Sequence, residues 1–155
     1  MNVKLHNMKV HSLQMLILGV LLMCGCTQQN GYIGDLFGSW SLTKITCNGD
    51  IVEIEYETVF SFQNEIVSIV GYVDPPFEAK TRYGNFTHLD QNLTLKFASE
   101  PTPTYGKGYM APEWLYFPKD ENILLFEVRK LTGRSMELSL ASDGSILHYS
   151  FRKTW

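Results

Sequence analysis

The sequence predicts an all-β fold, an antiparallel up-and-down barrel of about eight strands with one long aromatic and proline-rich loop. Apolar and polar side chains alternate with a period of two through most of residues 34–155, which is the pattern of strands with one buried face. Short turn signals separate these stretches, and no long helical pattern lies between them. With 155 residues, 45% of them hydrophobic and 13% aromatic, the chain can bury one sizeable core.

The N-terminal residues are excluded from this fold because they have the layout of a targeting segment. Lys4 and Lys9 precede an apolar run over residues 13–23, which is too short to cross a bilayer as a mature helix. We therefore predict a signal peptide over residues 1–25. The alternatives are an ordinary secretory peptide cleaved nearby and an uncleaved anchor.

Residues 22–26 read Leu-Met-Cys-Gly-Cys and resemble a bacterial lipobox, in which the small Gly25 precedes the cleavage site. The resemblance implies that Cys26 carries a lipid and that residues 26–33 form a polar tether to the domain. The membrane is then a partner through this lipid, in the bacterial cell envelope. Thr27 lacks the acidic character that retains some lipoproteins in the inner membrane, which favours the outer membrane.

Charge and cysteine content exclude further classes. Removing Lys4 and Lys9 leaves 11 of the 13 basic residues against 16 acidic ones, a formal charge of −5 in place of −3. No basic cluster of the kind that binds nucleic acid is present in the sequence. Once Cys24 leaves with the signal and Cys26 is acylated, only Cys47 remains, so we expect no internal disulfide and a buried, unreactive Cys47.

The first strand is predicted over residues 38–47. Trp40 and Leu42 share one parity along it, whereas Ile45 and Cys47 share the other. A change of phase by one residue is what a β-bulge produces. We therefore expect one continuous strand with a bulge near its middle.

The next four strands follow from turn residues and alternation. Asn48-Gly49-Asp50 is typical of a tight hairpin, and a single regular strand is expected over residues 52–62, with its glutamates on a solvated face. A strand over residues 66–73 follows. Then a hairpin is expected from strands over residues 80–89 and 93–97.

Residues 99–118 interrupt the alternation with four prolines and several aromatic side chains. Long loops in compact domains are usually functional or disordered, and the aromatic content favours an ordered one. We interpret this segment as a lid or rim over one barrel end, with a possible helical turn at residues 111–116. The alternative is a plain connecting loop whose aromatic residues pack on the outside.

Three strands complete the barrel, near residues 124–129, 136–140 and 147–151, and Ser142-Asp143-Gly144-Ser145 is a strong hairpin signal between the last two. On the final strand Leu147, Tyr149 and Phe151 share the inner face. His148 and Arg152 then lie on the other face.

Gly38 and Trp40 on the first strand, combined with Arg152 on the last, resemble the lipocalin and calycin pattern. The resemblance implies that the arginine lies across the tryptophan and closes the barrel base, a cation–π contact worth about 0.5 to 2 kcal/mol. The wider layout is similar to the small lipocalin-like lipoproteins of bacterial envelopes, much of whose family has no assigned function. It lacks the middle-strand signature and C-terminal helix of the lipocalins proper.

Such a barrel either holds one small ligand or fills its interior with side chains. The first hypothesis is a carrier of a small apolar or amphipathic molecule. The alternative is a solid barrel that binds an envelope protein or polymer through its surface, and a narrower version of it is an inhibitor of a host or competitor enzyme. The aromatic residues that would line a cavity, or else form the core, are Phe60, Phe62, Tyr72, Tyr83, Phe86, Phe97 and Trp114.

No catalytic, metal or cofactor site is predicted. The mature chain keeps two histidines, His88 and His148, which are isolated from each other in sequence. His88 beside Asp90 is more often surface decoration than an acid/base pair. Nucleophile-elbow, paired-cysteine and phosphate-loop motifs are absent from the sequence. The sequence therefore predicts a binding protein rather than an enzyme.

Overall fold

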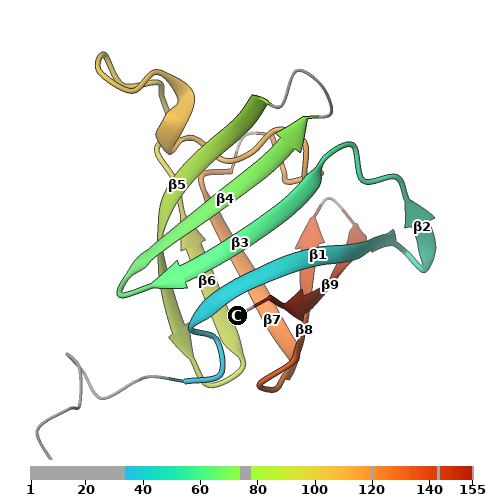
Figure 1. Ribbon diagram of the computed structural model, residues 1–155. Coiled ribbons are helices and arrows are strands. Elements are labelled where there is room, and N and C mark those ends of the chain that lie inside the picture. Colours follow the sequence, from blue (N-terminus) through green and yellow to red (C-terminus); the bar gives the residue numbers. More distant parts are fainter. Residues whose placement is uncertain (1–33, 74–77, 120, 143, 155) are drawn as a thin grey trace, which may run out of the picture. The chain divides into compact units, whose positions relative to one another are not determined.

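Nine antiparallel strands form one sheet that closes on itself, because β1 pairs with both β3 and β9 (Figure 1). This computed structural model describes residues 34–73, 78–119, 121–142 and 144–154. The predicted signal peptide, Cys26 and the tether lie outside them. The strands are β1 Gly38–Cys47, β2 Asp50–Val52, β3 Glu57–Gln63, β4 Ile66–Val73, β5 Glu78–Leu89, β6 Asn92–Lys96, β7 Ile123–Leu131, β8 Ser135–Ser142 and β9 Ser145–Lys153.

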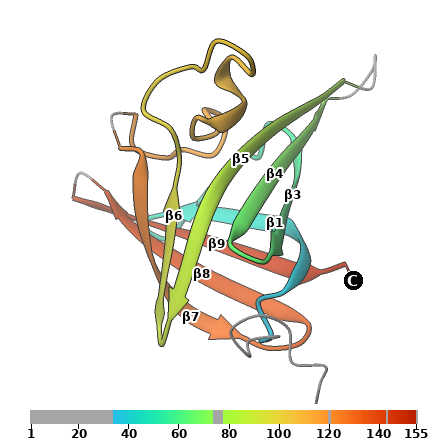
Figure 2. The same cartoon turned by 90° about the vertical axis from the view of Figure 1, so that its left-hand side faces the viewer.

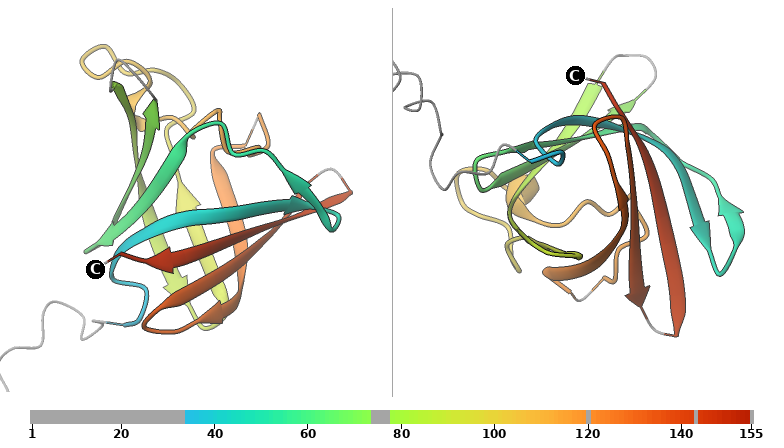
Figure 3. Two further views of the ribbon diagram at one scale, coloured as in Figure 1. Left: turned by 45° about the vertical axis from the view of Figure 1, so that its right-hand side comes forward. Right: turned by 90° about the horizontal axis from the view of Figure 1, so that it is seen from below.

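The predicted all-β barrel is confirmed, with eight strands in the closed wall and β2 as an extra one. Sequential strands are neighbours throughout, from β3 to β9, as in an up-and-down barrel (Figure 3). Within the described part of the chain, the only helix with assigned bounds is a single 3₁₀ turn, Lys107–Tyr109. None of the described helical residues form a helix long and apolar enough to cross a membrane.

β1 carries the predicted bulge. Its pairing with β9 shifts register between Leu42 and Lys44, and the extra residue, Thr43, donates its hydroxyl to the carbonyl of Ser150 at 2.9 Å. On either side of the bulge, Trp40 and Ile45 are both fully buried. The bulge therefore keeps the inner face of the strand apolar along its whole length.

The single strand expected over residues 52–62 is wrong. β2 pairs with the end of β1 and β3 with its beginning, and residues 53–56 run between them without strand pairing. The alternation in the sequence survives this break because Val52, Ile54 and Tyr56 still turn their half-buried side chains toward the core.

Several turns use residues that tolerate a positive φ. Asn48 and Gly49 have φ of 51° and 98° in the β1–β2 hairpin, and Asn64 and Asp90 adopt similar values in later turns. Asparagine, aspartate and glycine accept this conformation at low cost. These short turns set the meander order of the strands.

Residues 99–118 lie at one end of the barrel (Figure 2), with Tyr109 packed on the outer face of β5, and their role as a lid stays a prediction. The expected helical turn at residues 111–116 does not form, and the 3₁₀ turn lies earlier, at Lys107–Tyr109. Trp114, Leu115 and Phe117 are buried in the main core. The hydroxyl of the buried Tyr149 donates to the carbonyl of Leu115 at 2.9 Å, which fixes the segment to β9.

Candidate functional site

One end of the barrel, called here the Trp40 end, is closed by Trp40, Leu36 and Lys153. The indole of Trp40 is fully buried and donates from Nε1 to the carbonyl of Leu36 at 2.8 Å. The Lys153 ammonium lies 4.9 Å from the centre of the indole and donates to the carbonyl of Asp35 at 2.8 Å. Every polar group named here has a partner.

The prediction that Arg152 covers Trp40 is wrong, because Lys153 takes that place. Trp40 pairs in register with Lys153, and residues paired across antiparallel strands share a face. Arg152 pairs with Ser41 on the outer face and is exposed. Gly38, the third predicted closure residue, starts β1 opposite Phe62 with φ of 113°, a conformation that favours glycine.

Five of the seven predicted ligand residues lie on the inner side of the barrel. Phe60, Phe62, Phe97 and Trp114 are 1% to 5% exposed, and the half-buried Phe86 packs edge-to-face on Phe62 at 5.1 Å. A side chain facing a cavity that could hold a water molecule would keep accessible surface even inside a closed barrel. These four instead belong to a packed core, and their role in ligand binding stays a prediction.

The inward placement predicted for Tyr72 and Tyr83 is wrong. They are 49% and 42% exposed because inner positions on their strands have the opposite parity. On β4 the inner residues are Val67, Ile69 and Gly71. Tyr83 instead packs on the outside against Tyr109, with ring centres 5.9 Å apart.

The other barrel end, called here the Trp114 end, is built around Trp114, Gly71, Tyr56, Lys80, Arg82 and Glu113. The indole of Trp114 lies directly over Gly71, where a Cβ would stand only 3.0 Å from its atoms. Tyr56 meets the indole edge-on, with ring centres 6.0 Å apart. The Arg82 guanidinium lies 5.3 Å from its centre. Trp114 therefore plugs this end by fitting into the space that a glycine leaves.

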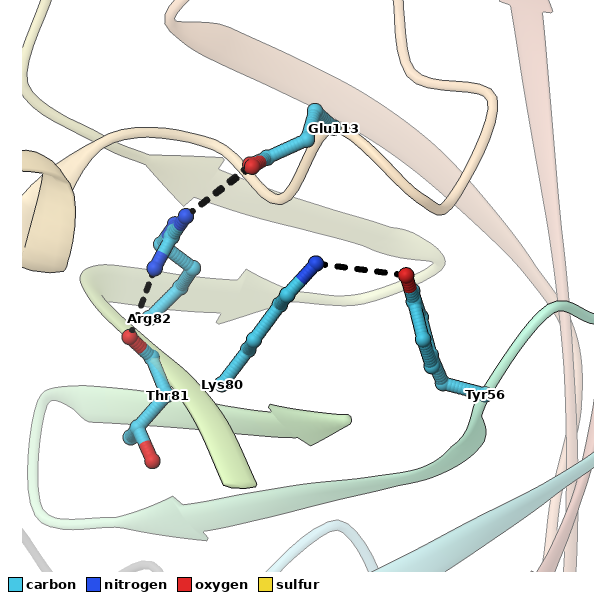
Figure 4. A network of polar contacts seen from close by, with 5 residues as sticks. All are labelled: Tyr56, Lys80, Thr81, Arg82 and Glu113. Atoms are coloured by element: carbon cyan, nitrogen blue, oxygen red, sulfur yellow. Dashed lines mark hydrogen bonds and ion pairs between the residues drawn. The ribbon is translucent and has the colours of Figure 1, made fainter. Parts of the chain in front are cut away.

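Two cations stand on the inner parity of β5 at this end. The Arg82 side chain, 11% exposed, binds both carboxylate oxygens of Glu113 through Nη2, at 3.0 and 3.1 Å, and donates from Nη1 to the carbonyl of Thr81. Lys80 donates to the Tyr56 hydroxyl at 3.2 Å and lies 4.7 Å from that ring's centre. Figure 4 shows how Arg82 and Lys80 project from β5 toward partners on two other segments.

These contacts displace two pKa values. Partial burial alone would raise the pKa of Glu113, but its own backbone amide and the Arg82 guanidinium outweigh this and hold the pKa below its ordinary value of 4.5. The hydrogen bond with Tyr56 raises the pKa of Lys80, with a smaller contribution from Glu113. Both groups are therefore charged at neutral pH.

Two buried polar atoms at the Trp114 end have no hydrogen-bond partner among the described residues. They are Nε1 of Trp114 and Nε of Arg82. A third such atom, Nε2 of His88, lies further along β5. A buried donor without a partner costs about 1 to 3 kcal/mol of stability. A role as a structural cap alone does not account for two such donors at one barrel end.

Sequence reasoning missed Lys80, Arg82 and Glu113. Hydrophobic alternation finds inward positions only where they are apolar, and the first positions of β5 on the inner parity are charged, namely Glu78, Lys80 and Arg82. The sequence signal that could have found Lys80 and Arg82 is their shared parity with Gly84 and Phe86, which the structure places on the inner face. No cluster of metal-binding side chains occurs within the described ranges.

Comparisons with known proteins agree with this fold. A family model described as a lipocalin-like domain matches residues 21–154. A lipocalin-like protein from Bacteroides uniformis has a similar structure, with a TM-score of 0.58 at 20% identity, over 77% of this chain and 99% of that one. An uncharacterized protein from Bacteroides eggerthii also has a similar structure, with a TM-score of 0.55 at 17% identity, over 76% of this chain and 98% of that one.

No curated protein matches the chain. At this level of identity, the two similar structures show only that the fold is shared. The family model, however, spans the predicted barrel domain almost completely, and the observed strand order is that of an up-and-down barrel. The chain therefore belongs to the family of lipocalin-like domains.

Proposed function

We propose that this protein is a carrier, without catalytic activity, that takes up a small amphipathic molecule at the Trp114 end. The observation that carries the proposal is the plug itself: a buried tryptophan over Gly71 whose indole N–H has no partner within the described part of the chain. In the closed form, Trp114 occupies the space that the apolar part of a ligand would take.

Backbone strain next to the plug supports a segment that can be displaced. Tyr116 has φ of 58°, a left-handed conformation that costs a bulky L-residue about 1 to 2 kcal/mol. It is held by a hydrogen bond from the Tyr116 hydroxyl to the carbonyl of Glu53 at 3.0 Å. Turning Glu113 and Trp114 outward gives the unmet N–H of Trp114 access to water, which offsets part of the lost burial, while Leu115 and Phe117 stay in the core.

The test is a titration of the full chain, processed by its own host, with dodecanoate while the indole N–H resonances are followed by NMR. We expect the Trp114 resonance to shift and the Trp40 resonance to stay. Trp114→Phe and Trp40→Phe variants assign the two signals. If no amphiphile in a panel of fatty acids, alcohols and lysophospholipids moves the Trp114 signal, the carrier proposal fails.

Native mass spectrometry of the same protein, purified gently, supplies an independent readout. A reproducible extra mass of a few hundred daltons is expected, and organic extraction identifies its class. The surface variant Tyr105→Ala is the matched control and should retain that mass. A bare polypeptide that stays bare with every added amphiphile contradicts a carrier.

A second candidate function, a solid barrel that binds an envelope protein or polymer, is favoured by an exposed aromatic patch. Tyr83, Tyr105 and Tyr109 are 42%, 65% and 39% exposed and contact one another through Tyr109. A photo-crosslinking residue at position 105, compared with one at the exposed Leu125 on β7, tests it. Site-specific crosslinks at 105 alone would support this function.

We further propose that the barrel is anchored in the bacterial envelope, in the outer membrane, through a lipid on Cys26. The support is the lipobox-like sequence, since that part of the chain is not described by the structure. Cys26→Ser should release the protein from the membrane fraction. Persistence of the variant there would assign the anchor to the hydrophobic run instead.

A further inference from the structure

We infer that the ligand carries a carboxylate head group and that Glu113 is its built-in competitor on Arg82. This inference rests on the proposed function, since it concerns the same site. Three observations lead to it: the origin of the two halves of the ion pair, the hydrogen-bonding capacity that Arg82 leaves unused, and the charge of the surrounding groups.

The two halves of the ion pair come from different parts of the fold. Arg82 belongs to the barrel wall, on β5, with a side chain only 11% exposed, whereas Glu113 belongs to residues 99–118 and its side chain is 55% exposed. Glu113 directly precedes Trp114 in the chain. Any movement that lifts the plug therefore also withdraws the carboxylate from Arg82.

Withdrawal of Glu113 leaves a cation without its counterion. Arg82 would retain only its bond to the carbonyl of Thr81, and a poorly solvated guanidinium without an anion is strongly destabilising. A ligand anion that replaces Glu113 removes this cost, so it favours the open form selectively. A ligand can shift an equilibrium only through such a difference in affinity.

The N–H groups along one edge of the Arg82 guanidinium are arranged to bind a carboxylate. Glu113 binds through Nη2 alone, and Nε has no partner among the described residues. A guanidinium can present two parallel N–H groups to the two oxygens of one carboxylate. An incoming carboxylate can thus make the two-pronged contact that Glu113 does not make.

Charge around the site also favours an anion. Lys80 stands two residues before Arg82 on the same inner parity, which begins with Glu78, and among the described residues its ammonium donates to the Tyr56 hydroxyl. The acidic groups that influence Lys80 are Glu113 and, as the smallest contribution, the exposed Glu55. With Glu113 withdrawn, two cations face the opened end above the apolar residues of the core.

The experiment compares dodecanoate with dodecanol, dodecyl phosphate and dodecyltrimethylammonium, with affinities measured from the Trp114 indole resonance. We expect wild type to bind dodecanoate at least tenfold tighter than dodecanol and not to bind the cationic amphiphile. Glu113→Gln removes the competitor without changing side-chain size, so it should tighten dodecanoate binding several-fold. Because the contact with Arg82 is lost on opening whichever ligand binds, dodecanol binding should tighten by a similar factor, and the preference for dodecanoate should stay. Glu100→Gln, the same change at an exposed position of the same segment, is the matched control and should behave as wild type.

Arg82→Met should abolish the preference for dodecanoate, and Arg82→Lys should restore only part of it, because lysine lacks the planar fork. Equal binding of dodecanol and dodecanoate by wild type would overturn the carboxylate inference while leaving the carrier standing. Weaker dodecanoate binding by Glu113→Gln would overturn the competitor role. Tighter binding of dodecyl phosphate would replace carboxylate with phosphate as the head group. Absence of any binding would refute the carrier proposal and this inference together.

Discussion

Each end of the barrel is closed by a tryptophan beside a cation, but the two ends differ in how fully the polar groups are hydrogen-bonded. At the Trp40 end the indole N–H is bonded and the cation Lys153 also holds a backbone carbonyl. At the Trp114 end the indole N–H has no partner within the described chain, and the cation depends on a half-exposed carboxylate. The comparison separates a permanent closure from one that can be exchanged.

The difference follows from which segment supplies each tryptophan. Trp40 is part of β1, between two hydrogen-bonded neighbours, β3 and β9. Trp114 belongs to a connection without strand pairing, and the next residue but one, Tyr116, is strained. A strand position cannot be vacated without opening the sheet, whereas a loop position can.

The largest expected effect comes from removing each indole. Trp40→Ala should lower the free energy of unfolding by about 5 kcal/mol and Trp114→Ala by about 3 kcal/mol, because the second change also removes an unmet N–H. Urea denaturation followed by circular dichroism measures both. A cost for Trp114→Ala equal to or above that for Trp40→Ala would break the comparison.

Replacing each indole by phenylalanine isolates the N–H group. Trp40→Phe leaves the carbonyl of Leu36 without its donor and should cost about 2 kcal/mol, whereas Trp114→Phe should cost less than about 1 kcal/mol. Thermal melts of both variants are sufficient. Equal losses would mean that the Trp114 N–H is satisfied in solution.

The third prediction concerns the corrected closure residue. Lys153→Met should lower the free energy of unfolding by about 1 kcal/mol, since the cation–π contact and the bond to Asp35 are both lost. Arg152→Met should change it by less than about 0.5 kcal/mol, as expected for an exposed side chain. A larger loss for Arg152→Met than for Lys153→Met in denaturant titrations would indicate that Arg152, not Lys153, closes this end.

The smallest expected effect is the pH dependence of the Glu113 contact. Because the pKa of Glu113 is lowered in the folded protein, its contribution is present above the ordinary value of 4.5 and is lost as the pH falls through the folded value. The stability advantage of wild type over Glu113→Gln should be below about 1 kcal/mol, since Glu113 is half exposed. It should disappear as the pH falls below 4.5 and through the folded value. An advantage that grows with acidity would contradict this ion pair.

Much of the barrel could be predicted from local signals. The bounds of β1, its bulge and the hairpin at Asn48 and Gly49 follow from alternation and turn chemistry. The break between β2 and β3 could not, because Ile54 and Tyr56 keep a strand-like alternation while their backbone leaves the sheet. Periodicity records which side chains face inward, not which backbones are paired.

The site was harder to predict because its inward residues are polar. Tyr72 and Tyr83 were placed inside for being aromatic, although Arg82, between Tyr83 and Thr81, holds the inner position. For closure, the parity of Phe151 favours Lys153 whereas the family resemblance favours Arg152, and the structure has Lys153 over Trp40. Trp114 was identified, but its contact with Gly71 depends on a crossing that no local pattern encodes.

The pairing of β1 with β9 also has a consequence for how the chain folds. Thr43 bonds to Ser150, 107 residues downstream, and Ser39 accepts hydrogen bonds from Thr154, 115 residues away. Contacts this distant in sequence slow folding because a long loop must close before they form. Strands β1 to β8 can assemble as a meander while its two edge strands, β1 and β8, wait for β9. Until β9 arrives, those edges are open to other chains, so the slowest step of folding is also the one most exposed to aggregation.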